Sequence, residues 1–171
     1  MSTLNAMQND IGLGVAVNAD QYLTFMLAGE EYGVDILRVQ EIKGWGGVRV
    51  VPDVPPYLKG VLNLRGALVP VLDLRLRFGL GQAEYSAVTV IIVVMVHDGE
   101  REIPLGLVAD AVSDVLEVAP DEFKAPPRFG QSGQARFMSG MVTKADRMVV
   151  VLEVDRLLKE SDLESLAELS A

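Results

Sequence analysis

The 171-residue chain carries an internal repeat. Tyr57–Leu74 (YLKGVLNLRGALVPVLDL) matches Phe137–Val154 (FMSGMVTKADRMVVVLEV) at an offset of 80 residues, and Gly33–Ile42 matches Gly106–Val115 at an offset of 73. Each half is rich in short strand-forming runs, with a turn signal about every 8–12 residues. Two copies of such a unit favour two small β-barrels over one large sandwich.

The most informative stretch of the first copy is Gly60–Asp73 (GVLNLRGALVPVLD). Its apolar runs, Val61–Leu64 and Ala67–Leu72, flank a tight Arg65-Gly66 connection, and glycine tolerates the positive φ that a two-residue hairpin turn requires. We therefore expect a β-hairpin with Arg65 at or beside its tip. Arg65 is then either a solvated turn residue or a functional cation held on a rigid element.

The two copies differ at this tip. Asn63–Gly66 (NLRG) in the first copy becomes Thr143–Asp146 (TKAD) in the second. A hairpin that needed an arginine only for folding would be expected to keep it in both copies. The difference therefore favours a site role for Arg65.

Local patterns place further elements along the chain. Leu74–Phe78 is expected to form one helical turn, Lys43–Gly47 and Pro120–Gly133 are expected to be loops, and His97-Asp98-Gly99 a turn. The other predicted strands are Gln21–Leu27, Glu31–Asp35, Ile36–Ile42, Ser86–Val96, Glu102–Val108, Ala111–Val118, Phe137–Thr143 and Arg147–Val151. We expect residues 1–19 to be a flexible tail and residues 159–171 to be an amphipathic C-terminal helix.

Composition narrows the class of protein. Half of the residues are hydrophobic, which predicts a packed globular fold. The absence of cysteine excludes disulfides and thiolate metal sites, and a net charge of −9 disfavours nucleic acid and anionic membranes as partners. The longest apolar run, Val88–Val96, is about half as long as a membrane helix requires. With no secretory signal pattern, these features indicate a soluble cytoplasmic protein.

Catalytic patterns are absent from the sequence. The single histidine, His97, has no nucleophile or orienting partner nearby in the sequence. No calcium-loop or phosphate-loop motif is present, so we expect no metal and no cofactor. We expect a protein that is not an enzyme, although carboxylates distant in sequence could converge.

An apolar groove flanked by one arginine would suit an amphipathic partner helix. Val39, Glu41 and Arg65 fall in the same half of the chain, on elements that are expected to be neighbours. For Val39, ordinary core packing is the alternative.

Four stretches of the sequence resemble the CheW family of bacterial chemotaxis coupling proteins. They are GEEYGVDILRVQEI (Gly29–Ile42), KGVLNLRGALVPVLDLRLRFG (Lys59–Gly79), VSDVLEV (Val112–Val118) and GMVTKADRMVVVLEVDRLL (Gly140–Leu158). The resemblance implies a mainly β fold of two five-stranded SH3-like barrels with short helices. It also implies that residues 20–158 form one CheW-like domain made of two intertwined barrel subdomains.

The resemblance further implies a non-enzymatic adaptor that couples methyl-accepting chemoreceptors to the CheA histidine kinase within a signalling array. The residues that match family positions for receptor binding are Val39, Glu41, Arg65 and Val90. The residues that match positions for contact with the CheW-like domain of the kinase are Lys124 and Phe129. The alternative is an SH3- or OB-like module that binds a small ligand or carbohydrate, but aromatic residues make up only 6% of the chain.

Overall fold

The structure is a computed structural model that describes residues 20–81, 84–125, 133–159 and 162. The strands are β1 (Asp20–Leu27), β2 (Glu30–Asp35), β3 (Val39–Gly44), β4 (Leu58–Leu64), β5 (Ala67–Asp73), β6 (Val90–Asp98), β7 (Arg101–Ala109), β8 (Ala111–Val118), β9 (Phe123–Lys124), β10 (Met138–Lys144) and β11 (Arg147–Leu152). The short helices are η2 (Ile36–Arg38), α2 (Leu74–Arg77), η3 (Pro120–Glu122), η4 (Gly133–Phe137) and η5 (Val154–Arg156).

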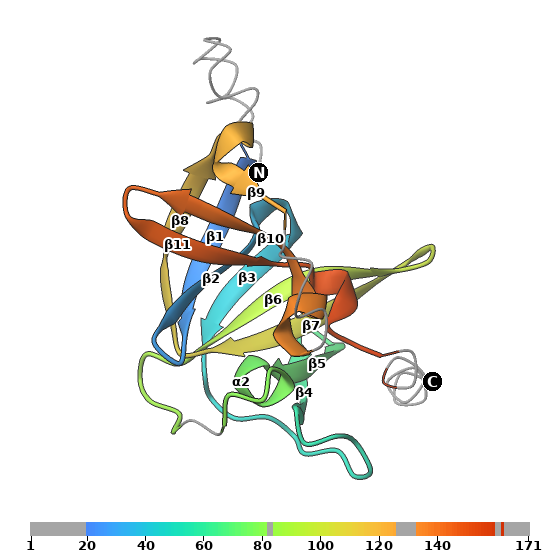
Figure 1. Cartoon of the computed structure of the whole chain (residues 1–171). Helices are drawn as coiled ribbons and strands as arrows, with labels where there is room; N and C mark the ends of the chain where they lie inside the picture. Colours follow the sequence, from blue (N-terminus) through green and yellow to red (C-terminus); the bar gives the residue numbers. More distant parts are fainter. Residues whose placement is uncertain (1–19, 82–83, 126–132, 160–161, 163–171) are drawn as a thin grey trace.

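The strands form two sheets. One has the order β3-β6-β7-β5-β4, and we call it barrel 1; the other has the order β8-β1-β2-β11-β10-β9, and we call it barrel 2. Figure 1 shows the consequence for the chain: the blue β1 and β2 lie between the yellow β8 and the red β11, so the first two strands share barrel 2 with the last strands of the described chain. The predicted fold class, mainly β with two SH3-like barrels, is confirmed.

Each barrel is closed further by a short segment that follows its edge strand. In barrel 1, Arg49 after β3 forms an isolated bridge with Val61 on β4. In barrel 2, β9 after β8 pairs with β10, which makes this sheet six-stranded where five strands were expected. The two barrels therefore share one plan, with β9 as a longer version of the Arg49 bridge.

A short crossover explains why the two copies of the repeat are intertwined. Suppose that all strands of the first copy formed one barrel. Strand β2 would then occupy the position that β7 holds in barrel 1, where it would run parallel to β3 with one strand between them. Parallel strands of one sheet need a connection of about a dozen residues. The three residues of η2 cannot span that distance, so the β1–β2 hairpin joins barrel 2 instead.

Two repeated glycines stand where the closing segment crosses the barrel. A Cβ at Gly60 would lie 2.1 Å from the backbone oxygen of Arg49, and a Cβ at Gly140 would lie 2.3 Å from the ring of Phe123. Both glycines also follow a register shift, in β4 and in β10 respectively. The repeat thus preserves glycine because a side chain would push the closing segment away.

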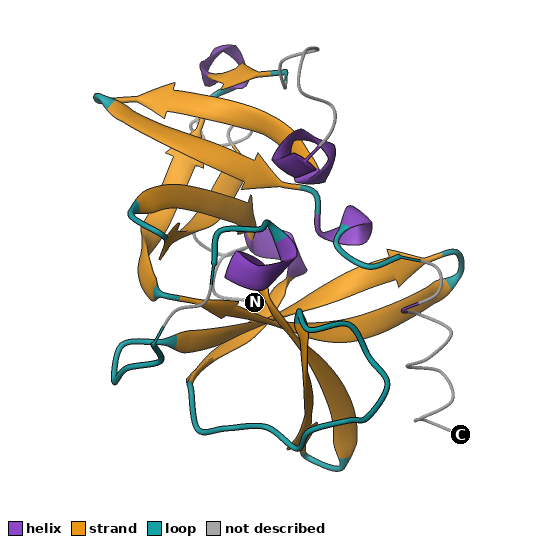
Figure 2. Ribbon diagram, turned by 60° about the horizontal axis from the view of Figure 1, so that its bottom comes forward, coloured by secondary structure: helices purple, strands orange, loops and turns teal. Residues whose placement is uncertain are grey.

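Alternating residues of each strand serve two different cores. Ile91 and Val93 of β6 belong to a cluster with Val69 and Val71 inside barrel 1. Ile92, Val94 and Val96 of β6 belong to a central cluster between the barrels, which is the largest of the three clusters. A third cluster fills barrel 2, with the members Leu116, Val118, Val142, Val149 and Val151. Most of the short helices lie between the two groups of strands (Figure 2).

The structure corrects several local predictions. Pro120–Gly133, predicted to be a loop, begins with η3 and strand β9, because Phe123 and Lys124 pair with β10. Ile36–Arg38 is a 3-10 turn rather than the start of a strand, because Asp35 accepts a hydrogen bond from the backbone N–H of Leu37 at 2.9 Å. The strand predicted from Ser86 begins only at Val90, because the N–H of Thr89 bonds back to the carbonyl of Ser86. His97 and Asp98 remain in strand β6, and the turn is formed by the two residues that follow.

The chain ends fall largely outside the described residues. These include the whole predicted tail, residues 1–19, and all of the predicted helix 159–171 except Lys159 and Asp162. The predicted boundaries at residues 20 and 158 remain predictions. In the described part of the chain, no helix is long and apolar enough to cross a membrane.

Candidate functional site

The candidate site begins on β3, one of the two edge strands of the barrel 1 sheet. Val39, its first residue, pairs with Val94 of β6 and packs partly buried against the central cluster. Glu41 pairs with Val93, whose side chain points into barrel 1. A register shift between Val39 and Glu41 sends these two side chains to different faces of the sheet.

Arg65 stands at the tip of the β4–β5 hairpin, as predicted. Arg65 and Gly66 have φ values of 52° and 87°, which is the pattern of a type I′ turn. The side-chain oxygen of Asn63 accepts the N–H of Gly66 at 3.0 Å and braces this turn. An arginine in the left-handed region is uncommon, so the turn is held by its neighbours rather than by local preference.

The structure brings Arg65 and Glu41 together. The Nη2 of Arg65 lies 2.8 Å from Oε2 of Glu41, although their strands stand at opposite edges of the barrel 1 sheet. The Arg65 side chain is 80% exposed and the Glu41 side chain only 26%. The pair therefore presents a solvent-facing guanidinium on a partly buried carboxylate, and an incoming anionic or polar group can still reach the arginine.

The other predicted site residues lie elsewhere. Val90 pairs with Gly44 at the opposite end of the β3–β6 pairing from Val39, and it also packs partly buried on the central cluster. Lys124 is exposed on β9 and pairs with Met141. Phe129 lies outside the described residues.

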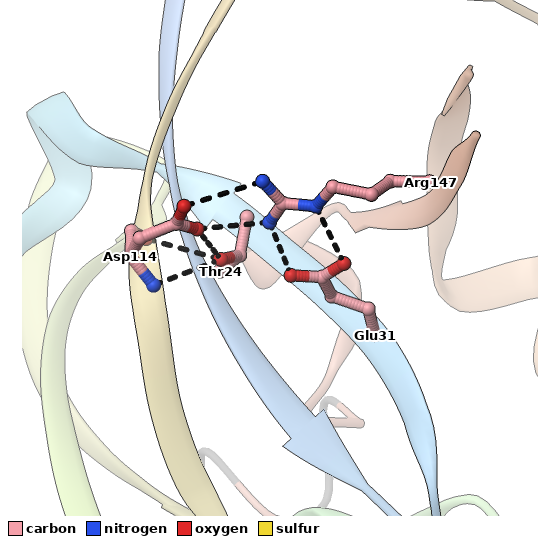
Figure 3. Close-up of polar contacts among 4 residues, drawn as sticks. All are labelled: Thr24, Glu31, Asp114 and Arg147. Atoms are coloured by element: carbon pink, nitrogen blue, oxygen red, sulfur yellow. Dashed lines mark hydrogen bonds and ion pairs between the residues drawn. The ribbon is translucent and has the colours of Figure 1, made fainter. Parts of the chain in front are cut away.

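Barrel 2 contains a counterpart of the Arg65–Glu41 pair (Figure 3). Asp114, the repeat equivalent of Glu41, accepts hydrogen bonds from Arg147 at 2.9 and 3.2 Å. Arg147 also donates to Glu31 on β2, with its Nε 3.1 Å from Oε1. Asp114 accepts a further bond from the buried hydroxyl of Thr24 at 2.6 Å.

This counterpart corrects the reasoning from the sequence. The second copy does keep an arginine, two residues beyond the position equivalent to Arg65, so the difference between the copies does not by itself argue for a site role. Arg147 is far less exposed than Arg65, with 33% of its side chain accessible. Hydrogen bonds from Arg147, and then from Thr24, lower the pKa of the Asp114 carboxyl below its ordinary value.

A second feature was missed at the sequence level. Trp45 stacks obliquely on Tyr85 with ring centroids 4.3 Å apart, and both rings line an open, largely apolar hollow beside the Val48–Lys59 segment. The Tyr85 hydroxyl donates to the buried carboxylate of Asp73, which caps α2. The single tryptophan of the sequence could have indicated this hollow. Its partner Tyr85, however, lies 40 residues away in the sequence and could not be identified from local pattern.

The described residues assemble no catalytic or metal centre. No group of three or more metal-ligating side chains occurs among them. The imidazole Nδ1 of His97 lies 3.7 Å from Glu102 at an exposed strand end. The described surface instead presents the Arg65–Glu41 ion pair and the hollow lined by Trp45 and Tyr85.

Comparison with known proteins identifies the family. A family model for the CheW-like domain matches residues 21–162. The chain belongs to the CheW-like family. The chemotaxis protein CheW of Klebsiella aerogenes is 36% identical over 143 residues, covering 84% of each chain. The CheW of Treponema pallidum is 31% identical over 157 residues, covering 91% of this chain and 92% of that protein.

A solved structure agrees with this result. The scaffolding protein CheW from Thermoanaerobacter tengcongensis superimposes with a TM-score of 0.74 at 30% identity, covering 82% of this chain and 88% of that one. As a member of the CheW-like family, the chain is a chemotaxis coupling adaptor and not an enzyme.

Proposed function

We propose that this CheW-like adaptor joins methyl-accepting chemoreceptors to the CheA histidine kinase and lets the receptors control kinase autophosphorylation. The observation that carries the proposal is the exposed guanidinium of Arg65, fixed at a braced turn and paired with Glu41 at 2.8 Å. A fixed, accessible cation suits polar contact with the tip of a helical partner.

The receptor contact is proposed at Val39, Glu41, Arg65 and Val90. The two valines supply partly buried apolar surface on the central cluster, and the ion pair supplies charge. Such a contact need not be tight, because many linked copies in an array raise the effective concentration of each partner.

The kinase contact is proposed at Lys124, which lies on barrel 2, and at Phe129, which lies outside the described residues. Lys124 is exposed on the short strand β9, away from Arg65 on barrel 1. Separate barrels allow both partners to be held at once. With these partners the protein would work in the cytoplasm, recruited to receptor arrays at the inner face of the membrane, and would need no cofactor.

A pull-down with a CheA kinase and a receptor cytoplasmic fragment tests the proposal. Arg65→Glu reverses the charge at the β4–β5 tip, and we expect it to lose the receptor while keeping the kinase. Arg101→Glu is the matched control, because Arg101 forms an exposed ion pair with Asp98 near the tip of another hairpin of barrel 1.

Three results would overturn the proposal. Wild type that binds neither partner would favour a binding module of another kind. An Arg65→Glu variant that binds both partners like wild type would remove the receptor site from this tip. An Arg65→Glu variant that fails to fold by circular dichroism would make Arg65 structural.

A further inference from the structure

The described chain passes from one barrel to the other at two crossovers. The first is η2, between β2 of barrel 2 and β3 of barrel 1. The second is Asp110, between β7 of barrel 1 and β8 of barrel 2. The repeat makes these crossovers equivalent, since Leu37 corresponds to Asp110 and Val39 corresponds to Val112.

The first crossover is fastened by Arg38, and we call this contact the first latch. Arg38 donates to both carboxylate oxygens of Asp155 in η5, at 2.9 and 2.8 Å, and to the carbonyl of Met95 at 3.0 Å. Asp155 also accepts the backbone N–H of His97 at 2.8 Å. The first latch therefore ties the crossover to strand β6 and to the helix that follows β11.

The second crossover is fastened by Asp110, and we call this contact the second latch. The Oδ2 of Asp110 accepts hydrogen bonds from Arg75 of α2 at 2.8 Å and from the backbone N–H of Ala28 at 2.9 Å. The backbone N–H of Asp110 donates to the carbonyl of Met26 at 3.0 Å. This latch ties the crossover to strand β1 and to the helix that follows β5.

The two latches hold equivalent backbone groups and use an equivalent partner position with the charge exchanged, while on the crossover Asp110 stands one residue before the equivalent of Arg38. The register of the strands makes Met26 equivalent to Met95 and Ala28 equivalent to His97. Asp155 and Arg75 are equivalent at the offset of 80. In one latch the crossover supplies the arginine, and in the other it supplies the carboxylate.

These ion pairs differ from ordinary surface pairs. All four charged side chains are only 21–32% exposed, and each latch also engages backbone groups of the neighbouring strand. Isolated exposed ion pairs contribute little to stability. Each latch instead binds equivalent backbone groups of a neighbouring strand. It therefore fixes the crossover to the barrel that the chain enters.

We propose that the two latches couple the barrels mechanically, so that a partner contact on β3 of barrel 1 changes the surface of barrel 2. This inference rests on the proposed function. Val39 directly follows Arg38, so the first latch adjoins the proposed receptor site. Coupling between two sites requires a physical element that both of them bias, and the crossovers are the places where the described backbone connects the barrels.

The first test opens the latches in the full chain with Asp155→Ala, Asp110→Ala and the double variant. Each variant's affinity for receptor fragment and for kinase is measured separately, followed by receptor control of kinase autophosphorylation in the ternary complex. We expect the double variant to bind each partner within about twofold of wild type but to lose about fivefold or more of receptor control.

A rescue variant separates a latch from a general loss of packing. Arg75→Asp with Asp110→Ala and Ala111→Arg copies the first latch onto the second crossover, because Ala111 is the equivalent of Arg38. This triple variant keeps an acid–arginine pair in a geometry that the fold already accommodates. We expect it to restore receptor control, whereas Arg75→Asp alone is expected to lose it.

Hydrogen exchange gives a readout that needs no partner. The N–H groups of Ala28 and His97 donate to the two latch carboxylates, so each should exchange about fivefold faster in the matching aspartate variant. Unchanged exchange would overturn the latches themselves. Normal receptor control in the double variant, or a loss that only follows lost affinity, would overturn the coupling. Failure of wild type to bind either partner would instead overturn the proposed function, and the exchange result would still decide whether the latches exist.

Discussion

Each barrel has an arginine at or next to the tip of its repeated hairpin, and the two arginines are held in different ways. In barrel 1, Arg65 rests on a single carboxylate and points into solvent. In barrel 2, Arg147 is gripped by Glu31 and Asp114, which come from two different strands, and Asp114 is in turn held by Thr24 (Figure 3). The ion pair in barrel 1 is therefore open, meaning that its arginine is exposed and has one carboxylate partner. The pair in barrel 2 is closed, meaning that its arginine is less exposed and has two.

The difference lies in what surrounds the acid. The neighbour of Glu41 on the next strand is the apolar Val93, while the residue equivalent to Val93 in barrel 2 is Thr24. In barrel 2 the buried Thr24 hydroxyl donates to Asp114, and Glu31 on β2 provides a second carboxylate for Arg147. In barrel 1, Pro104 stands at the position equivalent to Glu31, so Arg65 has no second carboxylate there and its guanidinium remains available for a partner.

The largest expected effect tests whether the two barrels are closed equally tightly. Gly60→Ala and Gly140→Ala each place a Cβ within 2.1–2.3 Å of the closing segment. We expect each substitution to cost about 3 kcal/mol or more of unfolding free energy, measured by denaturant titration, since overpacking forces the backbone to move.

Gly44→Ala is the matched control for both glycine variants. A Cβ at Gly44 meets no atom within 4 Å, and Gly44 lies in a strand of barrel 1. Its unfolding free energy should stay within about 0.5 kcal/mol of wild type. A Gly60→Ala or Gly140→Ala variant as stable as Gly44→Ala would show that the closing segment yields easily.

A medium effect is expected from the arginines themselves. Arg147→Ala leaves Glu31 and Asp114 facing each other without a cation, and we expect a loss of about 2 kcal/mol. Arg65→Ala removes one exposed pair, and we expect a loss of about 0.5 kcal/mol or less. Thermal or denaturant unfolding of both variants checks the contrast, and equal losses would contradict the division into an open and a closed pair.

The smallest expected effect is a dependence on pH. The pKa of Asp114 is lower in the folded chain than its ordinary value of 3.8, because Arg147 and Thr24 donate to the ionised form. The stabilisation is therefore present above about pH 4 and is lost as the pH falls through the folded-state pKa. Wild type and Asp114→Asn should differ in stability at pH 6 and converge in strong acid; a constant difference would exclude this linkage.

Much of the fold follows from local pattern and repetition. The Gly60–Asp73 hairpin could be predicted because apolar runs and a turn glycine act over a few residues. The contact between Glu41 and Arg65 could not be located, since it depends on how the sheet curls to bring its edges together. Arg147 could not be found by a fixed-offset comparison, because the position equivalent to Arg65 is the turn residue Ala145 and the arginine comes two residues later, at the start of β11.

The intertwined path also has a consequence for how the protein is made. Strand β2 finds its partner β11 only near the end of the described chain, with Gly33 beside Val151. During synthesis the edge of β2 must therefore stay unpaired until β11 has left the ribosome. Such non-local pairing is slow and exposes strand edges to aggregation. All strands of barrel 1 precede β8, so the half that carries the proposed receptor site can be complete while β2 still lacks its partner β11.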